Sequence, residues 1–188
     1  MITREQALEI LHQHMQNQNL RRHCYAVEAV MRSLAKYFHE DEDIWRIAGL
    51  LHYADYEMTK NDPSKHVVTV VEWLKEAGLE ERIINAIYAH GWQYVEGCPQ
   101  PKDNMEWSLY CCDELTGLIV AVALVRPDKK LSSVSVESVM KKWRNIAFAA
   151  GASREQIVMC EEKLGIKLDE FIKIALLAMQ GISSELGL

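Results

Sequence analysis

Hydrophobic residues recur along the chain at the three- and four-residue spacing of amphipathic helices. The clearest stripe predicts a long helix over residues 20–38. Its members are Leu20, Val27, Val30, Met31 and Leu34. No stretch alternates hydrophobic and polar residues for long enough to predict a strand; residues 67–71 come nearest, and their flanks favour a helix. The pattern therefore predicts an all-α protein.

Residues that start and stop helices divide the chain into about nine of them. The spacing of Thr3 and Gln6 is that of a capping box, and glycines such as Gly78 and Gly91 mark helix ends. The longest irregular stretch is expected at 92–104. The predicted helices cover residues 3–14, 20–38, 44–52, 63–77, 80–90, 105–125, 135–145, 153–164 and 168–186.

The length and composition are those of a globular chain of one domain, or at most two. Of the 188 residues, 49% are hydrophobic and 26% are charged, which argues against disorder. The net charge of -6 argues against general nucleic-acid binding, which requires a basic surface. The longest hydrophobic run, 115–125, is too short to span a bilayer and predicts a buried helix.

The cysteines and the first residues predict a cytoplasmic protein. The five cysteines form no CxxC pair and no zinc-finger spacing, so we expect reduced thiols. The polar segment 1–6 does not have the composition of a signal peptide.

Ionisable residues interrupt the hydrophobic stripes of five successive predicted helices. His52 follows Ile44 and Leu51 on one such stripe, and Asp55 points the same way if the helix continues through it. An unpaired buried charge costs several kcal/mol, so such groups need a partner. The same holds for the other members of the set, which are His23, His66, His90 and Asp113.

Histidines and aspartates that converge inside a helical bundle are the ligand set of a hydrolytic metal site. An ion held in this way polarises a phosphoryl oxygen and supplies hydroxide near neutral pH. Two other interpretations fit the same residues. The pocket could bind an anion without cleaving it, or the histidines could only hydrogen-bond one another and the backbone.

The spacing of these residues resembles that of the HD-domain superfamily of metal-dependent phosphohydrolases. The family pattern is an early histidine, a His-Asp pair after a leucine-rich helix, and a later aspartate; some branches add two histidines for a second metal. Here the pattern is carried by His23, His52, His66, His90 and Asp113. The segments 51–57, 113–119 and 147–151 are also similar to those of an uncharacterised bacterial branch.

The resemblance implies a single HD-like domain over residues 1–188. Its HD core would cover about 18–125, and the helices of 135–188 would pack on that core. It also implies roles for the site residues. His23, His52 and Asp113 would hold a divalent metal ion, and His66 and His90 would bind a second ion or the substrate phosphate.

One position departs from the family pattern, because Tyr53 stands where the aspartate of the His-Asp pair is expected. A phenol ionises near pH 10, against about 3.9 for Asp, and supplies no charge at neutral pH. Three outcomes remain open. Asp55 replaces the lost carboxylate, as ligand or as catalytic general base; or three ligands hold a more open ion; or the pocket holds no metal.

The function expected from the resemblance is metal-dependent hydrolysis of a small phosphoester, with nucleotides among the candidates. The alternative is an HD-like module, catalytically impaired, that binds a nucleotide or another anion. The metal would be Mn, Fe, Ni, Zn or Mg. The partner would be a small phosphorylated molecule, and neither nucleic acid nor membrane. The sequence is compatible with a homodimer but leaves the oligomeric state open.

Overall fold

The computed structural model describes residues 2–188, and within this range every regular element is helical. The prediction of an all-α fold is therefore confirmed. The longer helices are α1 (Arg4–His14), α2 (Gln18–Phe38), α3 (Glu42–Leu51), α5 (Val68–Glu76), α6 (Glu81–His90), α7 (Asn104–Leu124), α8 (Val136–Trp143), α9 (Arg154–Leu164) and α10 (Leu168–Gln180). The short elements are α4 (Tyr56–Thr59), η1 (Pro63–Lys65), η2 (Leu131–Ser133) and α11 (Ser183–Leu186).

The predicted helix starts agree with the observed caps. Thr3 accepts from the backbone of Gln6 while the Gln6 side chain accepts from the backbone of Thr3, which completes the capping box. Ser153 likewise accepts from the backbone N–H of Gln156 at the start of α9. These local hydrogen bonds satisfy donors that a helix start otherwise leaves free, so the sequence is sufficient to predict them.

Three predicted boundaries are wrong. The expected helix over 63–77 is a 3₁₀ turn followed by α5, because the backbone is extended at His66 and Val67 has a φ of 58°. The expected terminal helix over 168–186 breaks between α10 and α11. A short helix, α4, forms between the predicted helices 44–52 and 63–77, where no helix was expected.

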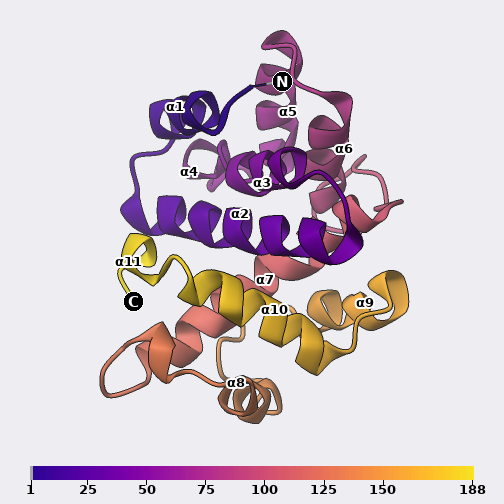
Figure 1. Cartoon of the computed structure of the whole chain (residues 1–188). Coiled ribbons are helices and arrows are strands. Elements are labelled where there is room, and N and C mark those ends of the chain that lie inside the picture. The colour runs from indigo at the N-terminus through magenta and orange to yellow at the C-terminus, as the bar shows by residue number, and fades with distance from the viewer. Residues whose placement is uncertain (1) are drawn as a thin grey trace.

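Helix α2 lies at the centre of the molecule (Figure 1). Helices α1, α3, α5 and α6 lie above it in this view, and α7 to α10 lie below. Its closest neighbour is α3, since the two run so near to each other that a Cβ atom on Gly49 would come within 2.9 Å of the carbonyl oxygen of Val27. Only glycine permits this approach. The close approach brings the end of α3 next to α2.

Helix α7 is the hydrophobic core helix, and it contacts α2, α6, α8, α9 and α10. By length and composition alone it could cross a membrane, but 72% of its apolar stretch is buried inside the molecule. The buried core helix of a soluble protein has the same properties.

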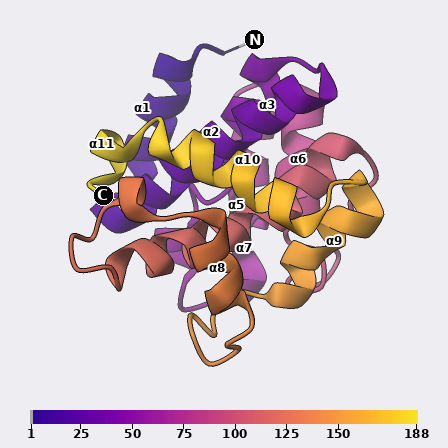
Figure 2. The same cartoon turned by 60° about the horizontal axis from the view of Figure 1, so that its bottom comes forward.

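The C-terminal helices cover α7 from the other side. Helix α10 runs across the front of the molecule over α2 and α7, and α8 and α9 lie beside it (Figure 2). The division into an HD core and packed C-terminal helices stays a prediction.

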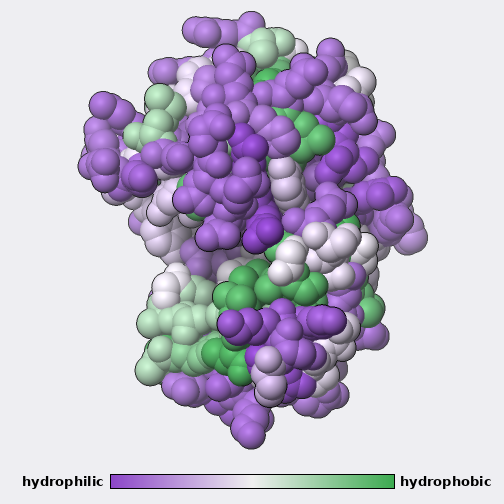
Figure 3. Space-filling model, turned by 90° about the vertical axis from the view of Figure 1, so that its left-hand side faces the viewer, coloured by the Kyte–Doolittle hydropathy of each residue, from purple (hydrophilic) through white to green (hydrophobic). Residues whose placement is uncertain are grey.

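One face of the molecule is hydrophilic above and hydrophobic below, with a hollow between (Figure 3). A groove of about 470 Å³ lies between α2, α7 and the C-terminal residues. Its hydrophobic lining includes Val120, Leu124, Leu186 and Leu188. His23 also lines this groove, so one member of the predicted site is reached from this side.

Candidate metal centre

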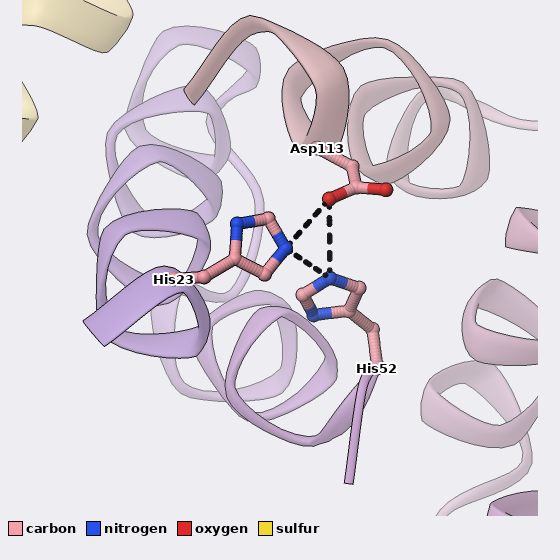
Figure 4. A group of neighbouring side chains, drawn as sticks. All are labelled: His23, His52 and Asp113. Atoms are coloured by element: carbon pink, nitrogen blue, oxygen red, sulfur yellow. Dashed lines mark hydrogen bonds and ion pairs between the residues drawn. The ribbon is translucent and has the colours of Figure 1, made fainter. Parts of the chain in front are cut away.

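Three predicted ligands meet at one point inside the bundle (Figure 4). His23 comes from α2, His52 caps the end of α3, and Asp113 lies in the middle of α7. The Nε2 atom of His23 lies 2.8 Å from Oδ1 of Asp113. The Nε2 atom of His52 lies 3.3 Å from that oxygen and 3.3 Å from Nε2 of His23. All three ligand atoms lie within 4.8 Å of one another, close enough to bind a single ion.

Hydrogen bonds fix which nitrogen of each histidine faces this point. Nδ1 of His52 donates to the carbonyl oxygen of Gly49 at 2.7 Å. Thr116 donates its hydroxyl to the backbone oxygen of Asp113, so it accepts from Nδ1 of His23 at 3.4 Å. With Nδ1 of each ring engaged in this way, Nε2 of each ring is the atom that would supply a lone pair to a bound cation. Such outer hydrogen bonds are what orient metal-binding histidines.

The pKa values of His52 and Asp113 favour the binding of a cation. Burial lowers the pKa of His52 to about 4, against the opposing effect of Asp113, so its imidazole is neutral at pH 7. Burial acts to raise the pKa of Asp113, but the imidazoles of His23, His52 and His90 outweigh it and hold that pKa well below its usual range. Two neutral nitrogens and one carboxylate oxygen are an ordinary ligand set for a divalent transition metal.

His90 extends the cluster, because its Nε2 lies 2.9 Å from the second oxygen of Asp113. Its Nδ1 atom is buried and has no partner among residues 2–188. The Nε2 atom of His66 is in the same state. Unpartnered buried nitrogens of this kind are rare in folded proteins, and both residues line the same cleft. Both residues are therefore candidates to contact a ligand in this cleft.

The structure places Asp55 away from the three ligands. Helix α3 ends at Leu51, so the expectation that one helix points His52 and Asp55 the same way is wrong. Oδ1 of Asp55 accepts from Nδ1 of His66 at 2.8 Å, and Oδ2 accepts from the backbone N–H of Val70 at 3.1 Å. Both oxygens are therefore occupied. A role for Asp55 as replacement ligand or general base stays a prediction.

Two clefts open on the site. One, of about 190 Å³, is lined by His66 and His90. The other, of about 300 Å³, is lined by His23. Tyr53, Asp113 and Glu114 line both clefts.

Two residues at the site had no predicted role. Glu114 lines both clefts and accepts from the backbone N–H of Ser153 at 2.9 Å, which ties the segment before α9 to the site. Burial, with the charge of Asp113, raises the pKa of Glu114. Thr116 orients His23. Both follow Asp113 on α7, at one and three residues, and the three-residue spacing was the available signal for Thr116.

The segment 147–151, noted for its resemblance, also reaches the site, since Ala149 and Gly151 line the cleft on the His23 side. Arg154 holds this segment by donating to the carbonyl oxygens of Phe148, Ala149 and Ala152. The segment therefore forms one side of this cleft, in a conformation that Arg154 holds.

Residues 20–96 match the family model described as HD domain. This segment is an HD domain. The match includes His23, His52, His66 and His90, and Asp113 lies beyond it. Comparison with curated proteins and with solved structures gave no match. HD domains form a superfamily of metal-dependent phosphohydrolases, and the cluster of His23, His52 and Asp113 is compatible with that chemistry.

Proposed function

We propose that this chain is a metal-dependent phosphohydrolase that acts on a small phosphoester, with nucleotides as the first candidates. The observation that carries the proposal is the convergence of two imidazole Nε2 atoms and one carboxylate oxygen from His23, His52 and Asp113. A cation satisfies all three at once. The bond from His52 to the Gly49 carbonyl is the arrangement expected around a metal ligand.

The proposed reaction assigns distinct roles to the residues around the centre. A bound divalent ion supplies Lewis-acid activation of a phosphoryl oxygen. His66 and His90 line the cleft and would bind the substrate phosphate there. Asp55 orients His66 from behind through the bond to Nδ1. Three protein ligands leave coordination positions for water and substrate, as in catalytic metal sites generally.

A second function is favoured by Tyr53, whose ring lies beside those of His23 and His52 at centroid distances of 4.9 and 4.8 Å. Burial raises the pKa of Tyr53, which keeps the phenol neutral. The site thus lacks a carboxylate at this position. A pocket of this composition would bind a nucleotide or another anion without cleaving it.

The remaining parts of the proposal concern the cofactor and the setting. The ion would be Mn, Fe, Ni, Zn or Mg, and the partner a small phosphorylated molecule in the cytoplasm. All five cysteines are free thiols, which fits this setting. We propose neither nucleic acid nor membrane as a partner. A homodimer is proposed as the state to test by light scattering.

Metal analysis of the purified protein, combined with turnover of a nucleotide panel, tests the proposal. We expect about one equivalent of metal in the wild type and loss of both metal and activity in His23→Ala. His39→Asn is the matched control, because His39 is exposed at the end of α2 with a φ of 58° that asparagine tolerates. A wild-type protein that contains no metal and shows no turnover would refute the enzymatic function. Full metal occupancy with phosphate binding but no turnover would support the second function.

A further inference from the structure

The ring of Tyr53 lies among the histidines of both halves of the site. Its centroid is 4.9 Å from that of His23 and 4.8 Å from that of His52. It is also 4.8 Å from the ring of His66 and 5.8 Å from that of His90. These are the separations of aromatic rings in contact. The phenol ring therefore contacts both the metal-binding half and the half formed by His66 and His90, which meet directly where the rings of His52 and His90 lie 5.1 Å apart.

Stacking against Tyr56 fixes the position of the Tyr53 ring. Tyr56 stacks on Tyr53 with 4.4 Å between centroids and 21° between planes. Tyr56 in turn contacts His66 at 5.2 Å. Because Tyr53 lines both clefts, its ring is a wall that they share. A carboxylate at this position would instead face both halves and could serve ions on either side.

The two aspartates nearest His66 and His90 are already engaged. Asp55 is fully buried and binds the far side of His66 and the backbone of Val70. Asp113 directs one oxygen at His23 and His52 and the other at Nε2 of His90. Glu114 lines the same cleft, but it accepts from the backbone of Ser153 and belongs to no group of three ligands among the described residues. Within residues 2–188, the only group of three ligands with the required spacing is His23, His52 and Asp113.

We infer that Tyr53 makes this centre mononuclear, and that His66 and His90 are thereby left to contact the phosphoryl group of the substrate. This inference rests on the proposed function, because it presumes an ion at the first three ligands. It adds that the ring of Tyr53, and not its hydroxyl, excludes a second ion. The two buried nitrogens without a partner then belong to a ligand-binding wall.

Metal stoichiometry measures this directly. Apo protein is loaded with Mn²⁺, desalted and analysed by elemental mass spectrometry. We expect one ion per chain in the wild type, one in Tyr53→Phe, and two in Tyr53→Asp. Tyr56→Phe is the matched control, since it changes the neighbouring tyrosine and should stay at one. Electron paramagnetic resonance of the wild type should show an isolated Mn²⁺ ion without exchange coupling.

Each result decides the inference. Two ions or an exchange-coupled signal in the wild type would overturn it and leave the proposed function intact. No ion in the wild type would overturn both. A Tyr53→Asp variant that folds and holds one ion would show that the ring is not what excludes the second. If that variant does not fold, the resonance spectrum of the wild type and the count for Tyr53→Phe still decide.

Discussion

The imidazole of His66 donates from Nδ1 to Oδ1 of Asp55 across 2.8 Å, and this carboxylate also accepts from the start of α5. One buried aspartate therefore fixes both a histidine of the cleft and the helix that follows it. The pairing explains why the chain bends at Val67, where the backbone reaches a φ of 58°. Backbone strain at Val67 is maintained by contacts on both sides of it.

Replacing Asp55 should cost stability before it affects metal binding. We expect Asp55→Ala to lower the free energy of unfolding by about 1–3 kcal/mol, because it leaves the Nδ1 of His66 and the N–H of Val70 without partners. Urea titration measures this. Asp55→Asn keeps the shape and one acceptor and should cost less. If Asp55→Ala instead loses its metal as His23→Ala does, Asp55 is a ligand after all.

Acid should destabilise the metal-free protein through His52. Its folded-state pKa, about 4, lies below the unfolded value of about 6.5, so the unfolded chain takes up a proton first. The stabilising contribution is complete above pH 6.5 and is lost as the pH falls towards 4, amounting to about 3 kcal/mol. Urea midpoints at pH 7, 6 and 5 in EDTA measure it. In His52→Gln the urea midpoint should depend less steeply on pH. An unchanged pH dependence would show that another group causes the loss of stability.

A buried charge cluster should matter more for stability than the surface pairs. Glu28 is 4% exposed and accepts from Arg4 at 2.6 Å and from Arg46 at 2.9 Å, which joins α1, α2 and α3. We expect Glu28→Ala to cost about 3–5 kcal/mol, because two arginines lose their partner. The exposed pair of Arg32 and Glu42 is the control, and Arg32→Ala should cost about 1 kcal/mol or less. If thermal unfolding shows the same loss of stability for Glu28→Ala and Arg32→Ala, this prediction is wrong.

Two glycines in helices should respond in opposite directions. Gly49→Ala would bring a Cβ within 2.9 Å of the Val27 carbonyl and 3.0 Å of the Glu28 Cα, so we expect α2 and α3 to separate and the melting temperature to fall. Gly117 lies in α7 with nothing within 4 Å of a Cβ. Gly117→Ala should stabilise by up to about 1 kcal/mol. A stabilised Gly49→Ala would show that the helices can adjust without cost.

Metal content adds a second readout for Gly49→Ala. His52 depends on the Gly49 carbonyl, and its partner His23 lies on α2. A shift between the helices should therefore lower metal affinity, whereas Gly117→Ala should leave it close to that of the wild type. Retention of full affinity in Gly49→Ala would show that the ligands follow the backbone.

Local patterns in the sequence were sufficient for much of the fold. The caps at Thr3 and Ser153 and the stripes of α2 and α3 depend on neighbours within a few residues, and these elements appear where predicted. The prediction failed where a distant contact determines the backbone. At 63–77 the helix starts only after His66, because Asp55 binds both His66 and the first turn of α5.

By itself the sequence determined that the protein is helical and that His23, His52 and Asp113 interrupt hydrophobic stripes, since periodicity and burial are readable residue by residue. Only the tertiary structure decided which polar groups share a partner. It directed Asp55 to His66 and away from His52, and placed the ring of Tyr53 against two sets of histidines at once. The reason is that such groupings depend on how α2, α3 and α7 pack, which no local pattern specifies.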